Sequence, residues 1–493
     1  MATFYVTNFG CRATQADGAA IERQLRERGL ERAGEAAEAG LVVLNTCTVT
    51  AAADQDARAA IRRIHRKNPD ARIVVTGCYA QRAPEEIAAL PGVSSVVGNS
   101  HKHQLAEIVV ADFGRPTADL GRQTSDGGLD AMVHADPQAK AKAFVPLAQL
   151  TSNVRSPIFV SDIFAHTELQ AAPVFDAANE RTRPNLKVQD GCDNRCSFCV
   201  IPYVRGQSRS LQLDEVIREV ETLVNAGYRE VVISGINLGR WGRDLAVSSQ
   251  PSALGKTGQR ATIDGRRPGF EDLVRAILSE TALQKLRISS VEPMDWSDEL
   301  IHLMADSPRI AKHAHVPLQS GSDAVLRRMH RKYRPWHYRE KIEKIRAAMP
   351  NAAIGADVMT GFPGESDLEF EATRRLVEDL PLTYLHVFTY SARPGTPAAA
   401  MSKHVPVDVA RERNHIFREV ADEKKMAFMN SFVGRTIEAI TLNIAGSDQE
   451  GEYTKGLTDN YLSIRVRGNH PPNRWIPAKV EGVSGGELVG FAS

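Results

Sequence analysis

The sequence lacks a membrane span. Within its 493 residues, no apolar stretch approaches the roughly 18 residues that a spanning helix needs. Residues 1–6 have neither a basic start nor an apolar core followed by a cleavage site, so they are typical of an opening strand and not of a signal peptide. We therefore expect a cytoplasmic protein with no membrane partner.

An excess of charge is also absent. The chain has 61 Lys and Arg residues against 60 Asp and Glu residues, a formal net charge of +1. Any affinity for nucleic acid must therefore come from local patches. With 42% hydrophobic and 25% charged residues, the composition is that of a globular protein, and the length predicts two to four domains.

Cysteine is scarce and its positions are informative. The chain has only six cysteines, which are Cys11, Cys47, Cys78, Cys192, Cys196 and Cys199. An even number is compatible with three disulfides. A long chain without a secretion signal is expected in a reducing compartment, however, and this favours metal binding or catalysis.

Residues 1–112 alternate strand and helix patterns. The continuous apolar runs at 41–45 and 72–77 are typical of parallel strands buried on both faces. Further strands are expected at 4–8 and 93–97, with helices at 15–28, 51–67 and 84–90. The pattern predicts a doubly wound α/β domain. Cys11, Cys47 and Cys78 each lie just past a strand's carboxyl end, where such sheets bind ligands, so we expect one shared site.

The remaining chain divides into three parts. Residues 113–180 lose periodicity and are expected to form an irregular linker, with a hairpin near 158–164. Residues 181–431 predict a parallel, incomplete (β/α) barrel, interrupted by a surface insertion at 246–268. After a helix at 407–430, short strands at 436–442, 461–466 and 478–482 predict a small β-barrel over 432–493. The six barrel strands are expected at 186–189, 230–234, 286–290, 313–317, 353–358 and 384–389.

A C-x3-C-x2-C motif, Cys192, Cys196 and Cys199, follows the first barrel strand. Thiolates favour soft metals, and three of them leave one iron of a 4Fe–4S cluster open for another molecule. A zinc knuckle completed by a distant histidine is the alternative. The motif and its place resemble the radical S-adenosylmethionine (SAM) superfamily, whose open iron holds the amino and carboxylate groups of SAM while an electron cleaves the sulfonium bond.

The N-terminal motifs narrow the resemblance. Gly10-Cys11, Asn45-Thr46-Cys47 and Thr76-Gly77-Cys78, followed by the two barrels, resemble the methylthiotransferases. The resemblance implies a second 4Fe–4S cluster at Cys11, Cys47 and Cys78 that carries sulfur, and a C-terminal RNA-binding TRAM domain. It also implies two SAM molecules: one supplies a methyl group, and the other a radical that removes a hydrogen. The family usually has Asn where this chain has Thr14, a departure that concerns the loop's hydrogen bonds and not the ligand.

The branch is indicated by residues 45–50, Asn-Thr-Cys-Thr-Val-Thr, followed by Ala53-Asp54. They resemble the branch that inserts a methylthio group at carbon 2 of N6-threonylcarbamoyladenosine, at position 37 next to the tRNA anticodon. Alternatives are the isopentenyladenosine branch and the ribosomal-protein aspartate branch. In a different class, a non-catalytic RNA-binding protein would carry structural metal sites, but such sites gain nothing from an open coordination position. The resemblance also implies an electron donor such as flavodoxin or ferredoxin; the sulfur donor stays open.

Candidate SAM contacts lie at strand ends around the barrel, where small residues let the backbone approach a ligand. Each is equally compatible with a barrel turn or a helix cap. They are Ser234, Gly235, Asn237, Glu292, Gln319 and Asp357. His386, on the sixth strand, is expected to be a hydrogen-bonded core histidine.

Candidate RNA contacts form three basic groups. The first, on the helix at 51–67, suits phosphate contact and comprises Arg58, Arg62, Arg63, Arg66 and Lys67. The second, Arg327, Arg328, Arg331 and Lys332, is expected near the barrel mouth. The third is Arg465 and Arg467, which strand period places on one solvent face. A solvated charged face is the alternative for the first group, and a solvated edge strand is the alternative for the third.

Overall fold

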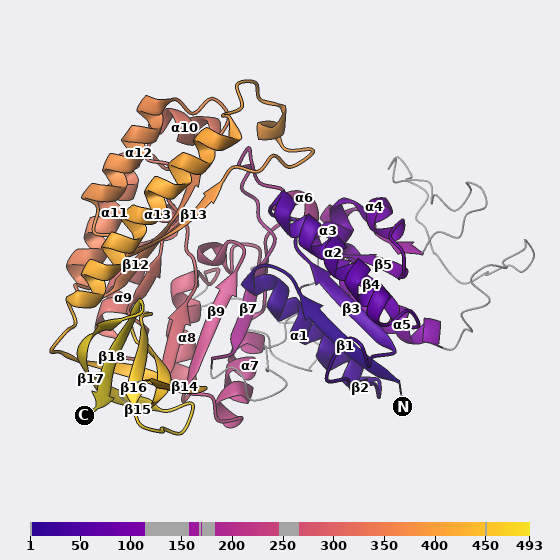
Figure 1. Ribbon diagram of the computed structural model, residues 1–493, viewed down its shortest axis with the longest axis horizontal. Coiled ribbons are helices and arrows are strands. Elements are labelled where there is room, and N and C mark those ends of the chain that lie inside the picture. The colour runs from indigo at the N-terminus through magenta and orange to yellow at the C-terminus, as the bar shows by residue number, and fades with distance from the viewer. Residues whose placement is uncertain (1, 114–156, 167–168, 170–182, 246–265, 449–450) are drawn as a thin grey trace, which may run out of the picture.

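The computed structural model describes residues 2–113, 157–166, 169, 183–245, 266–448 and 451–493 (Figure 1). Most of the expected linker at 113–180 and of the expected insertion at 246–268 lies outside these residues. None of the described helices is long and apolar enough to cross a membrane. In Figure 1 the N-terminal sheet stands beside the central barrel, and the C-terminal strands pack at the barrel's foot.

The N-terminal part is a parallel sheet in the order β2-β1-β3-β4-β5-β6. One face packs against α1 (Arg12–Glu27) and α5 (Leu105–Phe113), and the other against α2 (Ala51–Lys67), α3 (Cys78–Arg82) and α4 (Pro84–Ala88). Helices on both faces confirm the doubly wound prediction. The strands are β1 (Thr3–Asn8), β2 (Glu31–Arg32), β3 (Leu41–Thr46), β4 (Arg72–Gly77), β5 (Val93–Gly98) and β6 (Ile158–Phe159).

Two local predictions were wrong. The first helix begins at Arg12 and not at residue 15, so Cys11 is its N-cap residue. The expected hairpin near 158–164 does not form, because β6 pairs in parallel with β5. The Asp162 side chain then accepts a hydrogen bond of 2.9 Å from the Phe164 N–H, which starts the 3-10 turn η3 (Ile163–Ala165) in place of a returning strand.

The central part has six parallel strands, which confirms the predicted incomplete barrel. They form two sheets, β10-β9-β7-β8 and β11-β12-β13. Leu286 of β10 joins them to each other, because its N–H donates to the Arg309 carbonyl at 2.8 Å and its carbonyl accepts from the Ala311 N–H at 2.9 Å, just before β11. Among the described strands, none pairs with both β8 and β13, so the barrel stays open there. The strands are β7 (Asn185–Asp190), β8 (Arg209–Ser210, antiparallel), β9 (Glu230–Gly235), β10 (Lys285–Ile288), β11 (His313–His315), β12 (Ala353–Thr360) and β13 (Tyr384–Thr389).

Helices cover the outside of this barrel, because their apolar faces share one large core with the strands. The last of them, α13, ends at Asn430, as the sequence predicted. The helices are α6 (Ile201–Arg205), α7 (Leu213–Asn225), α8 (Phe270–Glu280), α9 (Asp298–Asp306), α10 (Asp323–Arg328), α11 (Pro335–Ala348), α12 (Asp367–Asp379) and α13 (Val407–Asn430).

The C-terminal part is a closed barrel in the order β14-β15-β16-β18-β17 and confirms the predicted small β-barrel. It is attached to the central barrel through Arg287, whose guanidinium donates to the carbonyls of Thr458 and Asp459 at 3.2 and 3.1 Å. The strands are β14 (Thr436–Asp448), β15 (Gly451–Thr458), β16 (Ser463–Arg467), β17 (Trp475–Ser484) and β18 (Glu487–Ala492).

Candidate functional site

Three cysteines lie at one edge of the N-terminal sheet. Asn8 is in register with Asn45, and Thr46 with Gly77, so β1, β3 and β4 end together. Cys47 and Cys78 directly follow the last two of these strands, and Cys11 follows the first. Gly10 has a φ of +103°, and a Cβ there would lie 2.8 Å from the Cys47 Sγ. Glycine therefore lets the Cys11 loop approach Cys47 closely.

The environment of these thiols suits a metal more than free cysteine. Burial raises the pKa of Cys47 to about 11, and the neighbouring thiols of Cys78 and Cys11 add to the rise. A bound cation would relieve both effects, because it stabilises the thiolate. The hydroxyl of Thr14 lies 3.5 Å from the Cys11 Sγ, which is the local outcome of having threonine at that position.

The second cysteine set lies on the loop after β7. Backbone hydrogen bonds of 3.1 Å tie Cys192 to Gly206 and Ser197 to Met329, so both ends of the loop are anchored to the barrel. Burial raises the pKa of Cys199 to about 12 and also raises that of Cys192. All three thiols of this set are partly buried, whereas in the first set Cys47 and Cys78 are buried and Cys11 is exposed.

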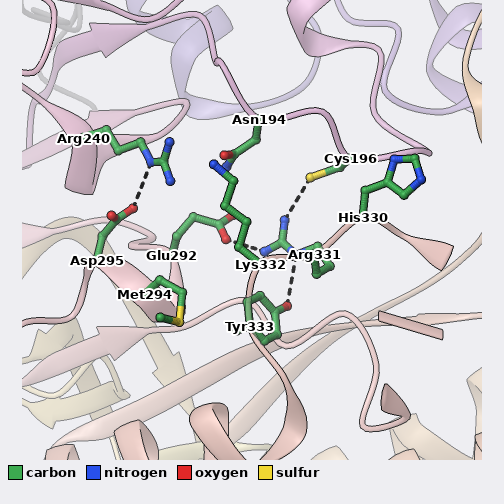
Figure 2. Close-up of a pocket in the computed structure, with 10 residues that line it drawn as sticks. All are labelled: Asn194, Cys196, Arg240, Glu292, Met294, Asp295, His330, Arg331, Lys332 and Tyr333. Atoms are coloured by element: carbon green, nitrogen blue, oxygen red, sulfur yellow. Dashed lines mark hydrogen bonds and ion pairs between the residues drawn. The ribbon is translucent and has the colours of Figure 1, made fainter. Parts of the chain in front are cut away.

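Arg331 does not lie on the surface, so its expected RNA contact is wrong. Its side chain is 5% exposed and forms an ion pair with Glu292. The guanidinium also donates to the Cys196 Sγ at 3.2 Å and to the Tyr333 hydroxyl at 3.2 Å. Figure 2 shows Arg331 between these groups in the wall of a pocket beside the cysteine loop. The sequence showed the charge of Arg331, but it gave no indication that the side chain is buried.

Three of the expected SAM contacts carry buried polar atoms without a hydrogen-bond partner among the described residues. These atoms are Ser234 Oγ, Asn237 Oδ1 and Gln319 Oε1. The Asn237 amide nitrogen also lies 3.7 Å from the Cys192 Sγ. Buried polar groups are normally satisfied, so these atoms are available to a polar ligand, and Asn237 is the residue of the three that lies beside the second cysteine set. Gly235, at the end of β9, leaves no room for a side chain, since a Cβ there would lie 2.9 Å from Gln189.

The other two expected SAM contacts have protein partners. Glu292 is paired with Arg331, and Asp357 Oδ1 lies 3.2 Å from both His315 Nε2 and His386 Nδ1. Burial opposes ionisation of Asp357, but the two neighbouring histidines hold its pKa well below the ordinary value. The expected hydrogen bond of His386 is present, but its expected core position is wrong, because the side chain is 60% exposed. The sequence analysis did not single out His315, because its position in a strand gave no indication that Asp357 lies beside it.

The structure places the two cysteine sets close to each other. Cys78 packs in one apolar cluster with Val200 and Val204, which follow the second set in the chain. The amide of Asn99 bridges the same parts, since its nitrogen donates to the Val204 carbonyl at 2.7 Å and lies 3.6 Å from the Cys78 Sγ. The fold therefore directs both sets toward a common region between the sheet and the barrel.

The expected RNA contacts of α2 differ in exposure. Arg58 is half-buried and pairs with Glu86 at 2.7 Å. The other four side chains are exposed, and within the described residues they have no ion-pair partner: Arg62, Arg63, Arg66 and Lys67. This face of α2 is thus an uncompensated basic surface.

The remaining basic residues are mostly paired. Arg327 pairs with Asp323 at 2.9 Å, Arg328 with Glu369 at 2.9 Å, and Arg465 with Asp448 at 2.8 Å. Arg467 pairs with Glu481 at 3.0 Å. Lys332 is exposed and is one of the residues that line the pocket in Figure 2. Arg465 and Arg467 do share a solvent face of β16, as strand period predicted.

Two known families match parts of the chain. The family described as Uncharacterized protein family UPF0004 matches residues 3–98, and the Radical SAM superfamily matches residues 186–377. Each match includes one of the two cysteine sets. Among solved structures, the radical S-adenosylmethionine methyltransferase TsrM from Kitasatospora setae has a TM-score of 0.50 at 17% identity, covering 81% of this chain and 77% of that one. This likeness concerns the fold alone.

Curated relatives are similar over most of the chain. Threonylcarbamoyladenosine tRNA methylthiotransferase MtaB of Bacillus subtilis is 34% identical across 95% of this chain and 91% of its own length. The MtaB of Rickettsia prowazekii is 32% identical across 93% and 92%. A tRNA-2-methylthio-N(6)-dimethylallyladenosine synthase of Novosphingobium aromaticivorans is 33% identical across 89% and 86%.

Proposed function

Since the chain belongs to the methylthiotransferase family of radical SAM enzymes, we propose that it inserts a methylthio group at carbon 2 of N6-threonylcarbamoyladenosine in tRNA. The observation that carries the proposal is the pair of three-cysteine sets, which the fold directs toward one region between sheet and barrel. The family is one of transferases that use a 4Fe–4S cluster and SAM. What is proposed here is the second cluster, the substrate and the residues that serve them.

Cys192, Cys196 and Cys199 would hold the cluster that binds SAM, and Cys11, Cys47 and Cys78 the second one. Both sets fit a soft metal cluster, because each offers three thiols and includes at least one that burial disfavours as an isolated thiolate, Cys47 in the first set and Cys192 and Cys199 in the second. When bound, the SAM cluster supplies the electron that cleaves SAM and starts hydrogen removal. Ser234, Asn237 and Gln319 would orient SAM through their unpartnered atoms, with Gly235, Glu292 and Asp357 lining its surroundings.

The substrate assignment is supported by the relatives named MtaB and by the basic face of α2. Arg62, Arg63, Arg66 and Lys67 lie in the last turns of the helix that begins at Ala51, and tRNA phosphates would contact this exposed face of the N-terminal domain. Five arginines are weaker candidates, because each already has an acidic partner: Arg58, Arg327, Arg328, Arg465 and Arg467. Lys332 remains a candidate, since no acidic partner is found for it among the described residues.

A second candidate function is methylthiolation of dimethylallyladenosine, which the 33% identical relative of Novosphingobium aromaticivorans favours. We further propose domain boundaries at 1–112, 113–180, 181–431 and 432–493, a flavodoxin or ferredoxin as electron donor, and a cytoplasmic location. The C-terminal barrel would act as the TRAM domain that contacts tRNA.

Two measurements test the proposal. Anaerobic reconstitution should give about eight irons per chain, since two 4Fe–4S clusters hold four each; about four would contradict the second cluster. Nucleoside mass spectrometry of tRNA from a strain without the gene should show that threonylcarbamoyladenosine has lost its methylthio group, while the dimethylallyl nucleoside keeps its own. Loss from the dimethylallyl nucleoside instead would assign the chain to the second candidate function.

A further inference from the structure

Three neighbouring strands of the central barrel each bring a side chain that can bind a metal to one place. His315 is on β11, Asp357 on β12 and His386 on β13. Asp357 is in register with His386, and β12 and β13 run side by side in Figure 1. His315 is in register with Gly355, which lies two residues before Asp357. Because residues two apart point to the same face of a strand, all three side chains share one face.

This face is the inner one of the barrel. The alternate residues of the same strands, such as Ala314 and Ala356, pack in the core that the strands share with the outer helices. Exposure rises across the three side chains, from 6% for His315 and 22% for Asp357 to 60% for His386. A ligand held by them would therefore be buried on the His315 side and open to solvent on the His386 side.

The spacing of the polar atoms is that of ligands around one ion. The Asp357 Oδ1 lies 3.2 Å from the His315 Nε2 and 3.2 Å from the His386 Nδ1, and the three atoms lie within 4.8 Å of one another. Two atoms that each bind a zinc ion at about 2.1 Å are about 3.0–3.4 Å apart when they subtend an angle of about 90–110°. The carboxylate oxygen and each histidine nitrogen are thus already spaced as neighbouring ligands.

His315 is oriented so that its Nε2 stays available. Its Nδ1 forms a hydrogen bond of 2.6 Å with the Ser290 hydroxyl, which fixes the ring. The Nε2 is buried and has no hydrogen-bond partner in the described part of the chain, although the Asp357 Oδ1 is close. Buried polar atoms are normally satisfied, and a histidine that binds a metal typically uses its other nitrogen for such an orienting hydrogen bond. The ring therefore has the arrangement of a metal ligand.

The charges of the site also favour a cation. Among the described residues, Asp357 has no lysine or arginine partner, and both of its neighbours are imidazoles. A largely buried carboxylate is normally paired with a cation or bound to a metal. Two imidazoles and one carboxylate suit a divalent transition metal, whereas Mg²⁺ and Ca²⁺ prefer oxygen ligands throughout.

We propose that His315, Asp357 and His386 bind one divalent transition-metal ion of the class that Zn²⁺ represents. Three protein ligands leave one position of a tetrahedral ion open, and water or an oxygen atom of a bound molecule would fill it. The site shares no residue with either cysteine set, so the inference depends neither on the second cluster nor on the RNA substrate. Asp357 can still line the surroundings of SAM, because Oδ1 makes the contacts with both histidines and leaves the other carboxylate oxygen for a second ligand.

The test uses the full-length protein, reconstituted anaerobically and then freed of loosely bound metal on a chelating resin. Equilibrium dialysis against Zn²⁺, followed by metal analysis, measures the affinity. His386→Ala and Asp357→Asn should each weaken zinc binding at least about 100-fold because each removes a ligand, and Ser290→Ala about tenfold because it removes an orienting partner. The matched control is His415→Ala, which removes an exposed histidine beside Glu419 on α13 and should keep the wild-type affinity.

X-ray absorption at the zinc edge, with one equivalent of Zn²⁺, identifies the atoms that bind the ion. Nitrogen and oxygen at about 2.0–2.2 Å are expected, without sulfur at about 2.3 Å. Sulfur around the zinc would assign the ion to cysteines and overturn the site. The proposal would also be wrong if wild type bound no zinc, if His386→Ala kept the wild-type affinity, or if a large excess of Mg²⁺ displaced the zinc.

Discussion

The guanidinium of Arg331 donates a hydrogen bond to the Sγ of Cys196 across 3.2 Å. The arginine is buried, and its charge is balanced by Glu292 and not by solvent. A cation held this way beside a proposed cluster ligand would act on that ligand's charge at close range, because hydrogen bonds to sulfur and nearby charge both tune iron–sulfur clusters.

Replacing Arg331 with Met should therefore make the midpoint potential of the SAM cluster more negative. The variant loses both a positive charge and an N–H···S hydrogen bond, so the reduced, more negative cluster is less stabilised. EPR-monitored redox titration measures the shift. Arg327→Gln, an exposed neighbour on α10, is the control and should keep the wild-type potential. An unchanged potential in Arg331→Met would mean that the contact is only structural.

Substituting one cysteine in each set should separate two activities. Cys192→Ala should abolish SAM cleavage, because it removes a ligand of the SAM cluster. Cys47→Ala should spare part of the cleavage and block sulfur insertion, since it removes a ligand of the proposed second cluster. Anaerobic assays of 5′-deoxyadenosine and of methylthio nucleoside distinguish these results. Normal product formation by Cys47→Ala would contradict the role of the first set.

The unpartnered polar atoms near the ends of the barrel strands predict which side chains contribute to SAM affinity. Asn237→Leu and Ser234→Ala should each weaken SAM binding about tenfold, which corresponds to the loss of one hydrogen bond of about 1.4 kcal/mol. Equilibrium dialysis of SAM against the reconstituted protein measures this affinity. Iron content serves as the internal control, because neither residue belongs to a cysteine set. Wild-type affinity in both variants would place SAM elsewhere.

The basic face of α2 should carry part of the tRNA affinity. Arg62→Gln and Arg66→Gln should weaken tRNA binding, and each should reduce the slope of log affinity against log salt by about 0.7–0.9 if one phosphate contact is lost. Filter binding at several salt concentrations gives both quantities. Arg58→Gln should change them less, because Arg58 is already paired with Glu86. If all three variants kept the wild-type slope of log affinity against log salt, this face of α2 would be excluded as a tRNA contact.

Arg393 should hold the N-terminal domain against the barrel. It is 3% exposed and pairs with Asp54 of α2, which also pairs with Arg82 at 2.9 Å. Arg393→Ala should lower the free energy of unfolding by about 1–3 kcal/mol, because Asp54 loses one of two buried partners. Denaturant unfolding measures the loss, and limited proteolysis should show cleavage between the two parts sooner than in wild type. Arg375→Ala, at an exposed site on α12, should be neutral.

The sequence by itself determined the three-part architecture and the positions of both cysteine sets. Hydrophobic period distinguishes helices from buried strands, and Cys192, Cys196 and Cys199 are close in the chain, so their loop needs no tertiary information. For Cys11, Cys47 and Cys78, the rule that parallel strands present ligands at their carboxyl ends was enough to bring them together. Turn-level details were predicted wrongly, as with the hairpin expected near 158–164 that does not form, because one capping side chain decides them.

Only the tertiary structure decided which charged residues face inward. Arg331 and Lys332 are neighbours in a basic run, yet one is buried against Cys196 and the other is exposed. Likewise, Asp17 and Arg205 meet although 188 residues separate them in the chain. Such pairs depend on how the sheet docks on the barrel, because a charge becomes buried only where a partner from another element compensates it. The sequence shows the charges; the packing assigns their partners.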